Sequence, residues 1–168
     1  MSEPQSALLL RRQLKELSIH PVQGFSAGLH DDNIYEWDVM IVGPEGTLYE
    51  GGFFKARLSF PPSYPQAPPT MRFVTDMWHP NVYEDGRVCI SILHEPGEDQ
   101  WGYESAAERW LPVHTVETIV LSVISMLSGP NDESPANAKA AKEFREDPAA
   151  FKKRVQRIVR RSEEEAFS

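Results

Sequence analysis

Residues 34–60, IYEWDVMIVGPEGTLYEGGFFKARLSF, decide the fold class, because they contain two strand-like runs separated by a turn. Residues 34–42 alternate well enough to be a strand, and residues 49–60 read as a second strand after the GPEGT turn. A third strand is predicted at residues 71–75, MRFVT. It follows the segment PPSYPQAPPT, whose prolines lack the backbone donor that regular structure needs. Short strands separated by turns are typical of an antiparallel meander.

Helical patterns flank these strands on both sides. Leucines within residues 6–17 fall on one face of an N-terminal helix. Thr115 is a candidate cap for a central helix whose apolar residues recur at helical spacing. The pairs Ser134-Pro135 and Asp147-Pro148 have the cap-then-proline pattern that starts a helix, so two further helices are predicted there. The order of helix, strands, loop and three helices predicts an α+β domain.

Length and composition restrict the class of protein. A chain of 168 residues forms one domain, 1–168, with a core that needs no disulfide or metal. The net charge of −8 argues against nucleic acid binding, and no window is apolar enough to span a bilayer. A single cysteine and an N-terminus without secretory features predict a reducing, intracellular location. The basic runs RRQLK and FKKRVQRIVRR, with acidic residues over 95–108, suit a protein partner, and solvated helix faces are the alternative.

Cys89 is the only cysteine of the sequence and lies in HPNVYEDGRVCISIL, residues 79–93. The arginine of a tyrosine-phosphatase loop would fall at residue 95, which is glutamate, and papain-like and caspase-like signatures do not occur. A thiol of ordinary pKa, about 8.5, is a few per cent ionised at neutral pH, which suffices when the substrate is already a thioester. The pattern therefore favours acyl carriage over hydrolysis. A buried, inert cysteine is the alternative, and a metal site from His79, Cys89 and His94 has no recognised spacing.

The stretch HPNVYEDGRVCISIL resembles the active-site stretch of the ubiquitin-conjugating enzymes, in which His-Pro-Asn precedes the acceptor cysteine. The similarity extends over nearly the whole chain, through GPEGTLYEGGFF, FPPSYPQAPPTMRF, RWLPVHTVETIVLSVISML and GPNDESPAN. HEPGEDQWGYESAAE, at about residues 94–108, resembles the acidic insertion of the G-type members. The resemblance implies the ubiquitin-conjugating (UBC) fold: an N-terminal helix, a four-stranded antiparallel meander, an active-site loop, a central helix and two C-terminal helices.

The same resemblance implies a function. Cys89 would accept ubiquitin as a thioester from the ubiquitin-activating enzyme and, with a ubiquitin ligase of the RING type, transfer it to a lysine of a substrate protein. Degradation-type polyubiquitin chains, a cytoplasmic or also nuclear location, and no cofactor or metal are expected, since the activating enzyme uses the ATP. Two alternatives remain: a non-catalytic scaffold of the same fold, whose known relatives lack the cysteine, and a carrier of a ubiquitin-like modifier.

Candidate residues around Cys89 have alternative roles. Asn81 would stabilise the oxyanion as the lysine attacks, or would hold the loop through backbone hydrogen bonds. His94, Glu98 and Asp99 of the insertion would position the lysine or take its proton, or would only gate access to the cysteine. Many family members have aspartate at the position of Ser134, so the carboxylate that usually lies near the lysine is replaced here.

The resemblance also implies two partner surfaces. Basic residues of the first helix would bind the activating enzyme, and two loops would bind ubiquitin ligases, with exposed charge that merely aids solubility as the alternative for the basic residues. The residues are Arg11, Arg12 and Lys15 on the helix, Gln66 and Ala67 in the first loop, and Pro112 and Val113 in the second loop.

Overall fold

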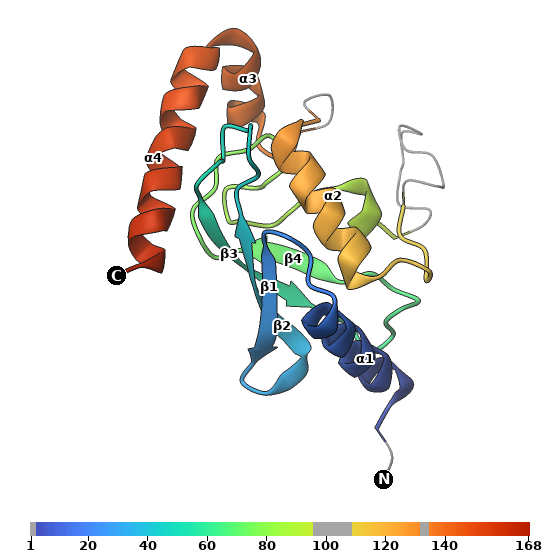
Figure 1. The fold of residues 1–168 in the computed structure, drawn as a ribbon. Coiled ribbons are helices and arrows are strands. Elements are labelled where there is room, and N and C mark those ends of the chain that lie inside the picture. The colour runs from blue at the N-terminus through green and yellow to red at the C-terminus, as the bar shows by residue number, and fades with distance from the viewer. Residues whose placement is uncertain (1–2, 96–108, 132–134) are drawn as a thin grey trace.

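A computed structural model describes residues 3–95, 109–131 and 135–168 of the chain. Within these residues, one α-helix, four strands and three further α-helices follow one another in the order that the sequence predicts (Figure 1). In chain order these are α1 (Gln5–Ile19), β1 (Phe25–His30), β2 (Asn33–Val42), β3 (Phe53–Ser59), β4 (Thr70–Phe73), the short 3₁₀ helix η1 (Ser91–Leu93), α2 (Val116–Ser128), α3 (Ala138–Glu146) and α4 (Pro148–Ala166). No helix within the described ranges is long and apolar enough to cross a membrane.

The strands form one antiparallel sheet in the order β1-β2-β3-β4, which confirms the meander. The second strand predicted from residues 49–60 is shorter than expected, because β3 begins only at Phe53. Gly51 has a φ of +85°, a left-handed conformation that a strand cannot contain. Tyr49 therefore belongs to the turn, where its buried ring packs edge-on against Phe54 at a centroid distance of 6.1 Å.

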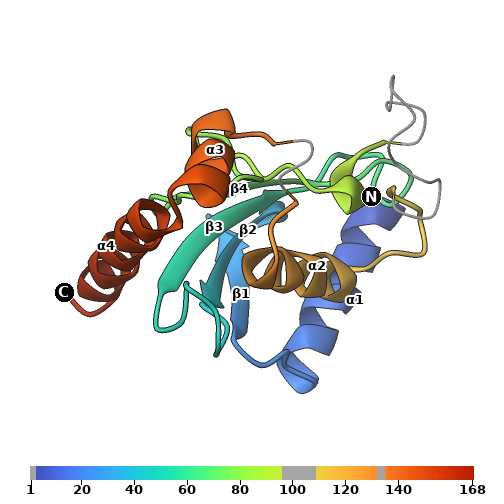
Figure 2. The same cartoon turned by 90° about the horizontal axis from the view of Figure 1, so that it is seen from above.

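One face of the sheet carries the core. Alternate residues of β2 and β3 are buried there, among them Trp37, Phe54 and Leu58, none of which is exposed to solvent. Buried residues of α2 belong to the same core, and so do Leu10 of α1 and Phe151 of α4. α1 and α4 lie at opposite ends of the sheet, with α2 between them (Figures 1 and 2).

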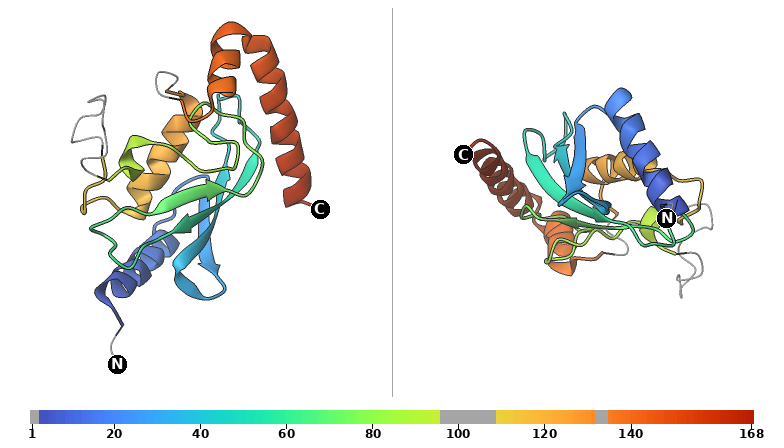
Figure 3. Two further views of the ribbon diagram at one scale, coloured as in Figure 1. Left: turned by 180° about the vertical axis from the view of Figure 1, so that it is seen from behind. Right: turned by 90° about the horizontal axis from the view of Figure 1, so that it is seen from below.

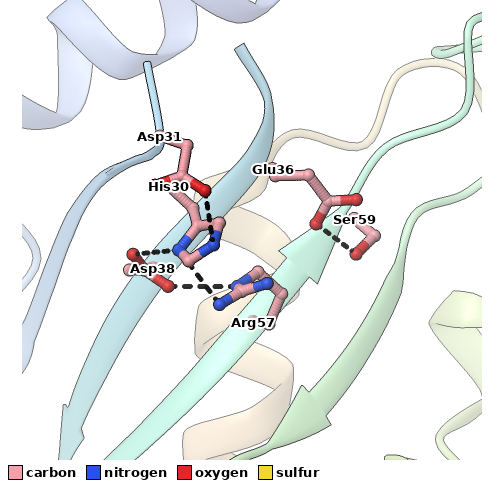
Figure 4. A network of polar contacts seen from close by, with 6 residues as sticks. All are labelled: His30, Asp31, Glu36, Asp38, Arg57 and Ser59. Atoms are coloured by element: carbon pink, nitrogen blue, oxygen red, sulfur yellow. Dashed lines mark hydrogen bonds and ion pairs between the residues drawn. The ribbon is translucent and has the colours of Figure 1, made fainter. Parts of the chain in front are cut away.

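The other face of the sheet is polar (Figure 4). Asp38 of β2 accepts a hydrogen bond from the Arg57 Nε atom of β3 at 3.0 Å and lies 3.0 Å from His30 Nδ1 of β1. Glu36 accepts a hydrogen bond of 2.6 Å from the Ser59 hydroxyl. Since Asp38 and its partners are largely exposed, these contacts add little stability and serve mainly to keep the strand register.

The starts of α2, α3 and α4 show how far the local sequence predicts where a helix begins. Thr115 caps α2 in a capping box with Thr118, and Asp147 caps α4 with Pro148 in the first turn, both as predicted. The start predicted at Ser134-Pro135 is wrong, because α3 begins at Ala138 and Asn137 is its cap. The Pro80 carbonyl accepts hydrogen bonds from the backbone N–H groups of residues 136 and 137, which keeps these two residues out of the helix.

Candidate active site around Cys89

Cys89 lies directly after an antiparallel bridge between Val82 and Val88, and its N–H donates to the Asn81 carbonyl at 2.9 Å. The side chain is half-buried. Its Sγ atom lies 3.6 Å from His94 Nε2. The charge of the Cys89 thiolate is the main reason why the pKa of Tyr83 is raised, so the tyrosine side chain lies in the neighbourhood of the sulfur. The sulfur is therefore only half-buried and has the imidazole of His94 in contact.

Tyr83 is a site residue that the sequence analysis missed. It is placed by a tight turn, in which the N–H of Tyr83 donates to the Arg87 carbonyl at 2.8 Å and Gly86 has a φ of +98°. Arg87 then lies over the tyrosine ring, 4.4 Å from its centroid, and pairs with Asp85 at 2.8 Å. The EDG sequence between two extended runs was the available signal, because such a turn brings the flanking residues together.

An open hollow of about 430 Å³ adjoins this turn. Tyr83 and the turn residues form one wall, and the residues that lead into α3 form the other. Lys139 and Glu84 pair across it at 3.7 Å. Tyr83, whose pKa is raised mainly by the charge of Cys89, therefore links the hollow to the neighbourhood of the sulfur.

His79 shapes the loop, as predicted, and has no role as a base. Its ring is fully buried, with Nε2–H donating to the Met126 carbonyl at 2.8 Å and Nδ1 accepting from the N–H of Asn81 at 2.9 Å. Burial lowers the pKa of His79 to about 4. The imidazole is thus neutral at physiological pH, and both nitrogens are used to fix the backbone.

Asn81 joins the cysteine loop to the segment that follows α2. Its Nδ2 donates to the Asn131 carbonyl at 2.7 Å, and its Oδ1 accepts from the Asn131 N–H at 2.8 Å. The side chain is 4 % exposed. Both ends of the amide therefore bind backbone groups here, as the loop-holding alternative requires, and the oxyanion role stays a prediction.

The ends of the acidic insertion meet beside Cys89. The N–H of Trp110 donates to the His94 carbonyl at 3.0 Å, which closes the base of residues 95–109. His94 itself is placed next to the sulfur, as predicted, while Glu98, Asp99 and Ser134 lie outside the described residues. Within the described ranges, no three His, Cys, Asp or Glu side chains are grouped so that they could hold a metal ion.

The residues predicted to bind partners lie on the exposed surface, except that Ala67 is half-buried. Arg11 is paired with Glu3 at 2.6 Å, whereas Arg12 and Lys15 are exposed along the same helix. Val113 is 79 % exposed at the tip of the second loop. Such an exposed aliphatic side chain, held on a loop, is a suitable contact for another protein.

Two further residues, Gln13 and Trp110, hold these elements together and were missed from the sequence. Trp110 Nε1 donates to the Pro65 carbonyl at 2.7 Å, which ties the second loop to the first. Gln13 Oε1 accepts from the Tyr64 hydroxyl and from the Val116 N–H, each at 3.0 Å, which ties both loops to α1. The structure thus joins the three predicted contact elements into one continuous side of the molecule.

Comparison with known proteins agrees with this geometry. A family model described as "Ubiquitin-conjugating enzyme" matches residues 9–159. The chain is 68% identical to ubiquitin-conjugating enzyme E2 7 of Arabidopsis thaliana over 161 residues, which cover 95% of this chain and 97% of that protein. It is 54% identical to human ubiquitin-conjugating enzyme E2 G2 over 154 residues, covering 91% and 93%. The solved structure of human ubiquitin-conjugating enzyme E2 G1 aligns with a TM-score of 0.68 at 58% identity, covering 77% of this chain and 100% of that chain. The chain therefore belongs to the ubiquitin-conjugating enzyme family.

Proposed function

We propose that this enzyme accepts ubiquitin as a thioester on Cys89 and transfers it to a lysine. The observation that carries the proposal is a half-buried thiol, 3.6 Å from His94 Nε2, near an open hollow that Tyr83 lines. In the loading step the thiolate attacks the thioester carbonyl of the carrier, the new C–S bond forms and the carrier's thiolate leaves. The exchange is nearly isoenergetic and uses no cofactor of this chain.

In the transfer step a lysine amine attacks the same carbonyl and the Cys89 thiolate leaves. The amine must lose a proton, and we propose His94, whose Nε2 lies 3.6 Å from the sulfur, as the group that takes it. Glu98 and Asp99 would position the incoming ammonium, and Asn81 would hold the loop or bind the developing oxyanion. Replacing Glu98 by Gln and Asp99 by Asn together should slow transfer at saturating ligase, and an unchanged rate would exclude their participation.

Exposed residues suit the partners of such a carrier. The basic side chains of α1 would bind an acidic surface of the activating enzyme, and the loops around Gln66 and Val113 would bind a RING-type ligase. We expect degradation-type polyubiquitin chains on substrate proteins, and a cytoplasmic or also nuclear location, by analogy with G-type relatives.

A loading assay tests the central step. Incubation with ubiquitin, activating enzyme and ATP should give an adduct that is lost on addition of reductant and does not form with Cys89→Ala. Parallel reactions with ubiquitin-like modifiers test the alternative cargo. If no modifier forms an adduct with the intact chain, the scaffold alternative is correct and the carrier function is excluded.

The ligase surface is tested by a matched pair of substitutions. Val113→Arg places a charge at the tip of the second loop, and Val74→Arg places one at a similarly exposed valine directly after β4, with exposed fractions of 79 % and 65 %. Only Val113→Arg should reduce the ratio of discharge rates with and without a RING ligase. Equal ratios for both variants would contradict a ligase site at this loop.

A further inference from the structure

The charge order along α4 is opposite to the order that stabilises a helix. A helix dipole favours acidic residues near the N-terminus and basic residues near the C-terminus. In α4 the N-cap Asp147 is the one acidic residue at the start, the first turn itself has none, and the last turn has no basic residue. Instead, the run FKKRVQRIVRR occupies its first two thirds and three glutamates, 163–165, follow. The stability of the isolated helix therefore does not explain this sequence.

The basic residues of α4 divide between two faces. Phe151, Val155 and Ser162 are buried, and the Ser162 hydroxyl accepts from the Phe53 N–H of β3 at 3.1 Å, which fixes one face on the sheet. At 100° per residue, Lys153, Arg157 and Arg160 lie on the opposite face, spaced i, i+4 and i+7. All three are exposed. We call these three residues the cationic stripe.

The residues of the cationic stripe lack the partners that neighbouring arginines have. Arg154 pairs with Glu143 at 3.2 Å and lies 4.3 Å over the Trp78 ring. Arg161 pairs with Asp76 at 3.2 Å. Among the described residues, none makes an ion pair or side-chain hydrogen bond with the cationic stripe. Like charges three and four residues apart repel each other, so the stripe weakens the free helix in a chain whose net charge is −8.

We propose that the cationic stripe is the docking site for an acidic segment of a partner protein. Carboxylates at matching spacing, on a helix or an extended strand, would relieve the repulsion and pair with all three cations. A lipid surface fits less well, because the apolar face of α4 is buried in the core and is not available to the membrane. An extended polyanion would also meet the three glutamates that end the helix.

The cationic stripe on α4 lies away from the surfaces that the proposed function uses. α4 lies at the end of the sheet opposite α1, and η1, which follows Cys89, lies on the side of α2 away from α4 (Figures 1 and 3). A partner on the stripe would therefore leave the α1 side and the cysteine free. Such a partner would fix the enzyme near a substrate or in an assembly while the transfer cycle proceeds.

The test is binding of a fluorescein-labelled, glutamate-rich helical peptide with Glu at i, i+4 and i+7 spacing to the full chain, followed by anisotropy. Arg157→Glu with Arg160→Glu reverses two charges of the stripe. Lys55→Glu with Lys142→Glu is the matched control, because it changes the net charge equally at two exposed lysines elsewhere. The stripe variant should bind about tenfold more weakly than the wild type, while the control stays within about twofold.

Three outcomes would overturn the proposal. Equal weakening in both variants would show unspecific attraction, and no binding by the wild type at low salt would show that the stripe is only a solvated face. Tighter binding of phosphatidylserine vesicles or duplex DNA through the same arginines would show that the partner is not a protein. Thermal melts of both variants confirm folding. Ubiquitin loading of the stripe variant, which should match the wild type, keeps this result separate from the proposed carrier function.

Discussion

Replacing Asn81 by alanine should loosen the loop that holds Cys89. The Asn81 amide makes two hydrogen bonds of 2.7 and 2.8 Å with the backbone of Asn131, and these bonds tie the cysteine loop to the segment after α2. Alanine removes both. The backbone of Asn131 then loses these two hydrogen bonds, and the cysteine loop loses its tie to that segment.

The magnitude follows from the number and burial of the bonds. A hydrogen bond contributes about 0.5–1.5 kcal/mol net, and Asn131 is exposed enough for water to replace part of the loss. Asn81→Ala should therefore lower the free energy of unfolding by about 2 kcal/mol. For a chain of this length, that corresponds to a fall in Tm of about 4–8 °C. Asn33→Ala, which loses one exposed bond to the Tyr35 N–H, should cost less than about 1 kcal/mol.

Urea unfolding measures the free energy of unfolding, and single-turnover transfer from the Cys89 thioester to free lysine measures the effect on the reaction. A loop-holding Asn81 predicts loss of stability, with loading and transfer both reduced by similar factors. An unchanged free energy of unfolding, with transfer alone reduced about 10²–10³-fold, would refute this reasoning. Asn81 would then act on the oxyanion, and its pairing with Asn131 would be incidental.

Three further substitutions and conditions test the framework around the site. Gly86→Ala should lower the free energy of unfolding in urea by more than about 2 kcal/mol, because its Cβ would lie 2.2 Å from the Phe73 carbonyl oxygen. Gly46 has a similar φ but no heavy atom within 4 Å of such a Cβ, so Gly46→Ala should lower the free energy of unfolding distinctly less. Gln13→Met should cost about 2 kcal/mol in the same measurement and weaken ligase-stimulated discharge, since two donors lose their shared acceptor, and unchanged stability would contradict this. The pKa of His79 is about 4 in the folded state and 6.5 as its reference value, so the unfolded state gains a proton first as the pH falls. The His79 contribution to the free energy of unfolding should therefore be full above pH 7 and fall by up to about 3 kcal/mol toward pH 4. His79→Asn should remove that part of the pH dependence.

The regular elements could be predicted because their signals are local. Helical and strand periods, the Thr115 cap and the Asp147-Pro148 start are properties of a few neighbouring residues, and the structure confirms them. The start at Ser134-Pro135 was wrong because a distant carbonyl, that of Pro80, accepts from the N–H groups of residues 136 and 137 and keeps them out of the helix. A tertiary hydrogen bond thus overrode a local pattern.

The site was only partly predictable for the same reason. Cys89 and His94 were found from motif and resemblance, and both lie at the same place. Gln13 and Trp110 were missed, because each acts through a contact that joins separate segments of the chain, whereas Tyr83 was missed although the EDG turn is a local signal. Gln13 is the clearest case, since its carbonyl oxygen serves donors 51 and 103 residues away.

Main-chain hydrogen bonds, rather than reactive side chains, define the environment of the sulfur. The N–H of Cys89 donates to Asn81, the carbonyl of Pro80 accepts from the segment before α3, and the N–H of Trp110 closes the insertion onto His94. The last of these bonds joins the two ends of the insertion beside the sulfur. Because thioester exchange needs a positioned thiol but no strong base, such a framework is sufficient for loading. The second step makes a further demand, because an amine must be positioned and deprotonated, and loading by itself therefore does not test the proposed role of the insertion.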